Sequence, residues 1–168
     1  EYLNCGILAH GAARVYCDEC KHSLLIAFSC KRRGVCPSCG AKRAVKFAEH
    51  IYSEVIEDIP HRHTVFTIPK RLRVFFKYDR KLHTILFRAA WGALSQVLGI
   101  DERELAAIFT VQTAGEALNY HPHLHGLLAD GYWNGVFTRF GEIDLKAVED
   151  AFAERVLAQL HKRELISD

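Results

Sequence analysis

Two closely spaced pairs of cysteines constrain this chain more than any other feature of its sequence. Cys17 and Cys20 form one C-x2-C pair. Cys36 and Cys39 form a second pair, and 15 residues separate the two. Each pair can present two thiolates from one tight turn, and two such turns supply the four sulfur ligands of a tetrahedral zinc site. Nothing in the sequence indicates the oxidising compartment that disulfides need, and a thioredoxin-like motif would explain only one pair. We therefore predict structural Zn²⁺ bound by these four cysteines.

The remaining cysteines, Cys5 and Cys30, have no regularly spaced partner. We favour a buried, unliganded thiol that packs like a small hydrophobic residue at each position. Two alternatives stay open at this point. Either residue could be an alternative zinc ligand, or it could be half of a second site that His10 or His22 completes.

The sequence changes character near residue 43. Residues 1–43 are rich in cysteine, glycine and basic residues, and they lack a sustained helical period. From Ala44 onward the apolar residues follow helical spacing until Pro60 ends the pattern. We therefore predict a zinc-binding domain, a small zinc ribbon, over 1–43 and a second domain over 44–168.

The second domain alternates strand-like and helix-like patterns. Strand-like runs occupy 64–68, 106–113, 123–129 and, more briefly, 136–140. Helical apolar stripes occupy 72–97 and 145–160, the latter behind Asp144 as a plausible N-cap. This order predicts an α+β fold, with an open antiparallel sheet and helices on one side.

Composition excludes a membrane protein. No apolar stretch approaches the roughly 20 residues that span a bilayer, and the N-terminus lacks the basic-then-apolar order of a signal peptide. These features predict a cytoplasmic protein that does not bind membranes. The chain contains no methionine, so we expect it to be a piece of a longer protein.

The net charge of +2 conceals a strong segregation of charge. Residues 31–46 contain six basic residues and no acidic one, and residues 62–88 contain eight basic residues and one acidic residue. The last 68 residues contain twelve acidic and six basic residues. Such segregation indicates a cationic surface for a polyanion, although lysines and arginines are also common on solvated faces. The residues that we expect to contact phosphates are Lys31, Arg32, Arg33, Lys70, Arg71 and Arg73.

A histidine-rich segment follows in the second domain. Residues i and i+2 of a strand share a face about 6.6 Å apart, so His123 and His125 can converge on one metal ion while Leu124 packs in the core. His121 would lie about 13 Å from His125 on a regular strand, which argues against three ligands from this strand alone.

A third donor should come from a neighbouring strand. If the preceding strand pairs antiparallel so that Val111 shares the face of Leu124, then Gln112 shares the face of the histidines. Gln112 is therefore the first candidate for this donor. Glu116 and His121 are the alternatives.

These blocks together resemble a known family, the two-tyrosine transposases of rolling-circle-type insertion sequences, which belong to the His-hydrophobe-His endonuclease superfamily. The resemblance covers nearly the whole chain. It rests on Cys5-Gly6, Ala9-His10-Gly11, Cys17-x-x-Cys20, Phe28-Ser-Cys-Lys-x-Arg33, Cys36-Pro-Ser-Cys39, Leu118-Asn-Tyr-His-Pro-His-Leu-His125 and Asp130-Gly131.

The resemblance implies an N-terminal zinc-binding domain and a ferredoxin-like or RRM-like catalytic sheet, with Mg²⁺ or Mn²⁺ held by His123 and His125. It further implies that the full protein cleaves and rejoins single-stranded DNA at transposon ends, in a bacterial, nucleoid-associated setting, through a phosphotyrosine intermediate. In this family the nucleophilic tyrosines lie on a helix well downstream of the histidines. No tyrosine follows Tyr132, so we expect the present chain to lack the nucleophile.

Two other functions compete with this reading. A polynuclear metal phosphoesterase or amidohydrolase could use the His-x-His motif with Asp130 further along, but only His161 follows as another histidine. A non-catalytic zinc-ribbon module that binds nucleic acid would leave the histidines incidental.

Overall fold

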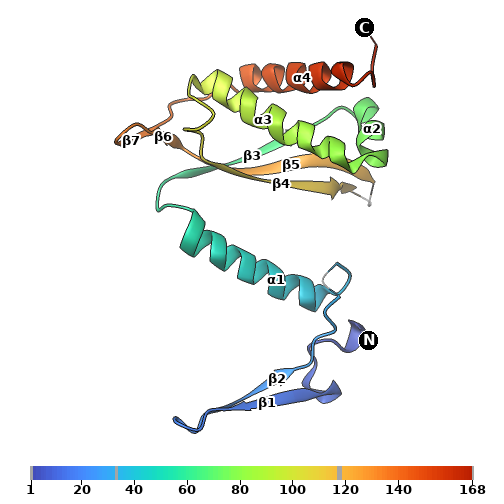
Figure 1. Cartoon of the computed structure of the whole chain (residues 1–168), viewed down its shortest axis with the longest axis vertical. Coiled ribbons are helices and arrows are strands. Elements are labelled where there is room, and N and C mark those ends of the chain that lie inside the picture. The colour runs from blue at the N-terminus through green and yellow to red at the C-terminus, as the bar shows by residue number, and fades with distance from the viewer. Residues whose placement is uncertain (1, 33, 117–118, 168) are drawn as a thin grey trace. The chain divides into compact units, whose positions relative to one another are not determined.

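The chain folds into two compact units. The computed structural model describes residues 2–32, 34–116 and 119–167 (Figure 1). The first unit spans Glu1–Asp58 and the second Ile59–Asp168. The boundary therefore lies later than the predicted boundary after residue 43, because the helix that follows the cysteines starts within the cysteine-rich segment and belongs to the first unit.

The first unit combines a β-hairpin with a helix. Strands β1 (Ala12–Tyr16) and β2 (Ser23–Ala27) pair antiparallel, with Ala13 opposite Ile26. Helix α1 (Pro37–His50) follows and continues into a π-helical turn, Ile51–Val55. Two short 3-10 turns, Tyr2–Asn4 and Leu8–His10, precede the hairpin.

Helix α1 begins at Pro37, seven residues before the predicted start at Ala44. Proline suits the first helical position, because its fixed φ is already helical and its missing N–H would have no partner there. The early start places Cys36 at the N-cap and Cys39 in the first turn.

The second unit contains a three-stranded antiparallel sheet. Its strands are β3 (His61–Thr67), β4 (Ala107–Ala114) and β5 (Tyr120–Ala129), in the order β3-β5-β4. Its helices are α2 (Arg73–Tyr78), α3 (His83–Leu98) and α4 (Leu145–Lys162). A separate hairpin pairs β6 (Gly131–Trp133) with β7 (Phe137–Arg139), and 3-10 turns occupy Lys70–Leu72 and Arg80–Leu82. The α+β class predicted from the sequence is confirmed.

Local sequence explains where the long helices start and stop. The Asp144 carboxylate accepts a hydrogen bond from the backbone N–H of Ala147 at 3.0 Å and caps α4, as predicted. Helix α3 ends at Gly99, whose φ of 67° lies in the left-handed region that glycine adopts without strain. None of the helices in the described chain has the length and apolar character needed to cross a bilayer.

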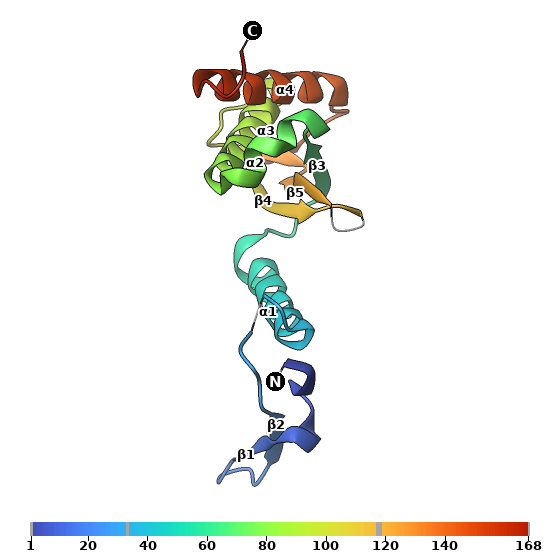
Figure 2. The same ribbon diagram turned by 90° about the vertical axis from the view of Figure 1, so that its right-hand side faces the viewer.

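The core of the second unit lies between the sheet and its helices. Figures 1 and 2 show α2, α3 and α4 on the same side of the sheet. Leu124 and Leu128 of β5 are buried there, together with Ile85 and Leu86 of α3 and Phe152 of α4. Because side chains alternate along a strand, His123, His125 and Leu127 of β5 face the other side of the sheet.

Candidate metal sites and nucleic-acid contacts

Four cysteines of the first unit meet in one cluster: Cys5, Cys30, Cys36 and Cys39. Their sulfur atoms all lie within 4.8 Å of one another. The Sγ atoms of Cys5 and Cys39 are 3.5 Å apart, and those of Cys30 and Cys39 are 3.7 Å apart. Two sulfur ligands about 2.3 Å from a tetrahedral Zn²⁺ lie about 3.8 Å from each other. The cluster therefore has the dimensions of a four-sulfur zinc site.

Three parts of the chain build this cluster. Cys5 follows the first 3-10 turn, Cys30 follows β2, and the C-x2-C pair opens α1. The backbone N–H of Cys30 donates to Cys5 Sγ at 3.3 Å, and Ser29 Oγ lies 3.2 Å from Cys39 Sγ. These contacts hold the end of β2 against the start of α1.

The sulfur atoms also influence one another's ionisation. The hydrogen bond from the backbone N–H of Cys30 lowers the pKa of Cys5 to about 6, and the Ser29 hydroxyl lowers the pKa of Cys39. Although the backbone N–H of Arg32 lowers the pKa of Cys30, burial and the neighbouring sulfur atoms raise it to about 11 overall. Sulfur atoms packed this closely cannot all become thiolates unless a cation offsets their charge. The donor set therefore fits a bound Zn²⁺.

The predicted ligand set is corrected at two positions. Cys36 and Cys39 join the cluster, but Cys17 and Cys20 are exposed at the closed end of the hairpin, whereas Cys30 follows its open end. A five-residue strand separates these ends by about 16 Å, so one ion cannot reach both. The sequence signal for Cys30 as a ligand is its position six residues before Cys36, close to the second cysteine pair.

Histidines line the face of the sheet that is turned away from the helices. His123 and His125 lie on β5, on either side of the buried Leu124. The predicted register is observed: Val111 of β4 is opposite Leu124, and Gln112 is opposite His123. Gln112 therefore lies on the histidine face, as the alternation of the two strands predicted.

His125 is the centre of a network of contacts on this face. Its Nε2 lies 3.1 Å from Oε1 of Gln112, and its Nδ1 lies 3.1 Å from Nε2 of His63 on β3. The rings of His63 and His125 stack, with centroids 5.4 Å apart. Prediction from the sequence missed His63, because the strand was expected to begin at residue 64 whereas β3 begins at His61.

The orientation of His123 is set by the backbone. Its Nδ1 lies 2.7 Å from the carbonyl oxygen of His121, which can only accept a hydrogen bond. Nδ1 of the neutral ring must therefore carry the proton, and Nε2 keeps a lone pair. Histidines that bind metals commonly donate their other ring N–H in this way.

The other candidate donors differ in their surroundings. Glu116 is exposed. The buried Nε2 of His121 has no hydrogen-bond partner among the described residues, and burial, followed by the charges of Arg73 and His123, lowers the pKa of His121. Both factors disfavour the charged form of the ring.

Asp130 has a structural role in this chain. The residue is 3% exposed, and its carboxylate forms ion pairs with Arg62 and with Arg139, the latter at 2.6 Å. These contacts tie β3 to the hairpin of β6 and β7. A carboxylate held in this way does not supply the metal ligand that the phosphoesterase reading requires.

Tyr120, the tyrosine nearest to the histidine motif, has its hydroxyl group engaged. The group donates to the carbonyl oxygen of Phe76 at 2.6 Å and lies 3.0 Å from Nε2 of His83. Burial raises the pKa of Tyr120. This tyrosine packs the sheet against α2.

The predicted phosphate contacts fall in both units. Lys31 and Arg32 are exposed in the first unit, and Arg33 lies outside the described residues. Lys70 and Arg71 are exposed before α2, whereas Arg73 is half-buried and donates from Nε to the carbonyl oxygen of Ile68 at 3.4 Å. The structure thus leaves four of the five described cations open to solvent.

Comparison with known proteins identifies relatives of this chain. Residues 1–68 match the family described as "Transposase zinc-binding domain". The chain is 31% identical over 142 residues to the transposase for insertion sequence element IS801 of Pseudomonas savastanoi pv. phaseolicola, covering 80% of this chain and 34% of that protein. It is 32% identical over 132 residues to the protein named "Putative transposase y4qJ" of Sinorhizobium fredii, covering 76% and 32%. No solved structure matches the chain significantly.

The chain spans about a third of the length of these two relatives. The match of the zinc-binding family agrees with the four-sulfur cluster, and both relatives extend the similarity into the second unit. Residues 1–68 thus match the transposase zinc-binding domain family, and 80% of the chain is similar to part of the transposase of an insertion sequence element.

Proposed function

We propose that this chain is the part of a transposase that binds single-stranded DNA and positions it for metal-assisted cleavage. The observation that carries the proposal is the arrangement on β5 and β4. Two histidines, His123 and His125, share a face with the amide of Gln112. Imidazole nitrogens and an amide oxygen together suit a divalent transition metal or a hard cation such as Mg²⁺ or Mn²⁺.

Each residue has a distinct role in this site. His123 offers Nε2 because its Nδ1–H is directed at a backbone carbonyl. His125 and Gln112 offer Nε2 and Oε1, which are 3.1 Å apart, close to the spacing of adjacent ligands about 2.1 Å from one ion. His63 then accepts the remaining ring N–H of His125 and fixes its orientation. When bound, the metal would polarise a scissile phosphate and stabilise the charge that develops on its oxygens.

The reaction of the full protein is a transesterification. A tyrosine hydroxyl from a later segment loses its proton and attacks phosphorus, and the bond from phosphorus to the 3′ oxygen breaks. The 3′ oxygen takes up a proton and becomes a free hydroxyl, while the 5′ phosphate stays linked to tyrosine. The reverse step rejoins the strand. The sheet face turned away from the helices suits a single strand, whose phosphates are accessible without a paired partner.

The cations around the sites hold the DNA at transposon ends in this proposal. Lys31, Arg32, Lys70 and Arg71 contact phosphates, so affinity for single-stranded DNA should fall steeply with salt. Arg33, outside the described residues, and Arg73 complete the expected set. Action on such DNA assigns the protein to the bacterial nucleoid.

The test is formation of a covalent adduct between protein and DNA. A labelled oligonucleotide is incubated with Mn²⁺ and then analysed by denaturing electrophoresis. We expect no adduct with the 168-residue chain, and an adduct when the chain is joined to the remaining segment of the IS801 relative. His123→Ala should abolish that adduct, whereas His22→Ala, which removes an exposed histidine of the first unit, should not. An adduct from the chain alone, or one unaffected by His123→Ala, would overturn this account of the site.

A further inference from the structure

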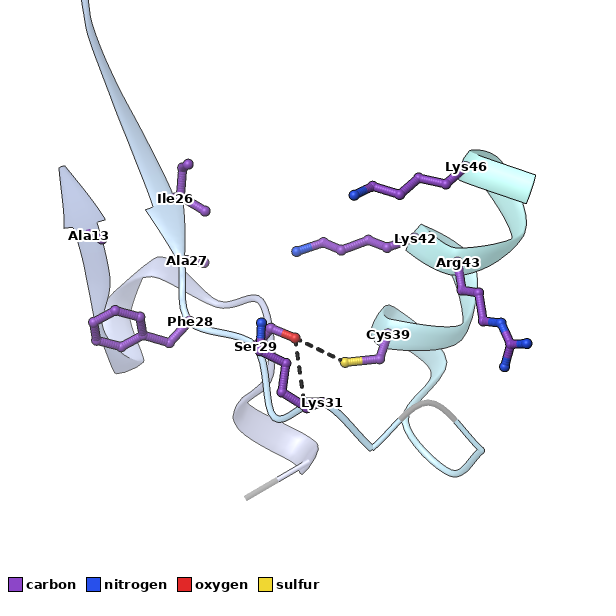
Figure 3. Close-up of a pocket in the computed structure, with 10 residues that line it drawn as sticks. All are labelled: Ala13, Ile26, Ala27, Phe28, Ser29, Lys31, Cys39, Lys42, Arg43 and Lys46. Carbon is purple, nitrogen blue, oxygen red and sulfur yellow. Dashed lines mark hydrogen bonds between the residues drawn. The ribbon is translucent and has the colours of Figure 1, made fainter. Parts of the chain in front are cut away.

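A groove in the first unit lies between β2 and α1 (Figure 3). Its volume is about 750 Å³, and it is open to solvent along the hairpin. The residues that line it divide into an apolar wall and a cationic wall. They are Ala13, Ile26, Ala27, Phe28, Ser29, Lys31, Cys39, Lys42, Arg43 and Lys46.

The apolar wall is the face of the hairpin that carries Phe28. Ala13 lies opposite Ile26 across the two strands, and Phe28 follows two residues later on the same side. Phe28 is 61% exposed and Ile26 is 47% exposed. An aromatic ring left this open beside a groove is available to stack on a planar group.

The cationic wall is one face of α1. Lys42 and Lys46 are four residues apart on the helix, and Figure 3 shows both side chains directed toward β2, while Arg43 points away from it. No acidic residue occurs between Glu19 and Glu49. Among the residues that the structure describes, neither Lys42 nor Lys46 forms an ion pair. The helical wall of the groove therefore carries lysines that no carboxylate of the described residues neutralises.

The floor of the groove is part of the cysteine cluster. Ser29, at the end of β2, contacts Cys39 in the first turn of α1. Zinc bound by the cluster would therefore hold the two walls at a fixed separation, because one wall is attached to Cys30 and the other to Cys36 and Cys39.

We propose that this groove binds a segment of single-stranded DNA, with a base stacked on Phe28 and the flanking phosphates paired with Lys42 and Lys46. Lysines supply charge without sequence preference, and an aromatic ring binds any unpaired base through its face. A duplex would hide its base faces from Phe28, so the aromatic wall selects an unpaired strand. The inference rests on the proposed function for the identity of the nucleic acid, but it assigns a binding site separate from the histidine face.

The test uses the zinc-loaded 168-residue chain and a fluorescein-labelled oligo-dT, with binding followed by anisotropy at several salt concentrations and without Mn²⁺. Phe28→Ala should weaken binding about tenfold and leave the salt dependence unchanged, while Phe28→Tyr should bind like the wild type. Lys42→Ala with Lys46→Ala should reduce the slope of log affinity against log salt by about 1.4, the value for two contacts to a single strand. Lys162→Ala, which removes an exposed lysine of α4 in the second unit, is the control, with at most a small effect on affinity.

Additional variants and conditions distinguish a failure of this inference from a failure of the proposed function. His123→Ala should leave Mn²⁺-free binding intact, and removal of zinc should abolish the contribution of Phe28. Preference for a duplex of the same length, or for an acidic peptide, would overturn the inference, as would zinc-loaded Phe28 and lysine variants that bind like the wild type. If those variants are neutral while His123→Ala still abolishes the adduct of the joined protein, the groove is wrong and the proposed function stands. If the groove variants lose binding but His123→Ala does not affect the adduct, the groove stands and the proposed function is wrong.

Discussion

The two units of this chain are stabilised in different ways. Among the described residues, the buried hydrophobic side chains of the first unit are Cys5, Cys36 and Cys39. The second unit buries a continuous cluster of 18 residues between its sheet and helices. In a unit whose interior consists of sulfur atoms, binding of a metal ion must offset the conformational entropy lost on folding. In a unit with an apolar core, the removal of apolar surface from water offsets that loss.

This difference also explains where each unit can carry function. The first unit leaves apolar residues of its hairpin exposed, including Leu24, Ile26 and Phe28, because the cysteine cluster already fixes the fold. In the second unit, one face of the sheet is buried against the helices and forms the core. The other face can therefore carry polar residues. Histidines can therefore occupy alternate positions of β5 without loss of the core.

Removal of zinc should produce the largest effect and should confine it to the first unit. Binding of a structural zinc ion contributes on the order of 10 kcal/mol to the folding of such small modules. After complete chelation, or in Cys36→Ser, residues 1–58 should become sensitive to proteases. Both tryptophans, Trp91 and Trp133, lie in the second unit, so their fluorescence and its unfolding transition should not change.

Cys17→Ser provides the matched control for this prediction. Cys17 belongs to the other C-x2-C pair, which lies outside the cluster. The variant should therefore retain one tightly bound Zn²⁺ per chain. Loss of zinc from Cys17→Ser and Cys36→Ser alike would restore the ligand set predicted from the sequence. Full protection of residues 1–58 after zinc removal would refute the metal-dependent fold.

Truncation of Leu124 should produce a smaller effect, confined to the second unit. Leu124 is fully buried at the centre of β5, and replacing such a leucine with alanine costs about 3 kcal/mol. Leu124→Ala should lower the free energy of unfolding measured by tryptophan fluorescence and leave zinc content unchanged. Leu127→Ala, on the other face of β5 and only partly buried, should cost less than about 1 kcal/mol. Equal costs at both positions would mean that the two faces of the sheet are wrongly assigned.

Loss of the Asp130 charge should produce the smallest effect, and it should depend on pH. Hydrogen bonds from Arg139 and then Arg62 hold the pKa of Asp130 below its ordinary value of 3.8. A depressed pKa stabilises the fold above the ordinary value, and this contribution disappears as the pH falls through the lower, folded value. Asp130→Asn should therefore lower the Tm of the second unit by roughly a few degrees at pH 5 to 8. The difference from the wild type should shrink below about pH 4, and a difference that grows in acid would contradict the ion pairs.

The sequence predicted those features that depend on local periodicity. Alternation along β5 was enough to bury Leu124 and to place Gln112 opposite His123, because a strand has a side-chain period of two. The helix cap at Asp144 also follows from local chemistry. The α+β class follows from the order of these local patterns.

The features that the sequence did not predict depend on tertiary contacts. The two C-x2-C pairs have the same spacing, and only the path of the hairpin separates Cys17 and Cys20 from the cluster. The sequence pattern did not place His63 on a strand, for a related reason. Its segment lacks β-branched residues before Thr64, and pairing with β5 extends the strand back to His61, which lies opposite Ala129.

We expect the two units to bind metal ions of different kinds, zinc in the sulfur cluster and a weaker, exchangeable divalent ion on the histidine face. Titration of the zinc-loaded chain with Mn²⁺, followed by the loss of the free Mn²⁺ signal in electron paramagnetic resonance, measures the second kind of binding. We predict one weak Mn²⁺ site per chain that disappears in His123→Ala and His125→Ala, with Zn²⁺ retained in both. No Mn²⁺ binding by the wild type, or binding that both variants retain, would contradict the account.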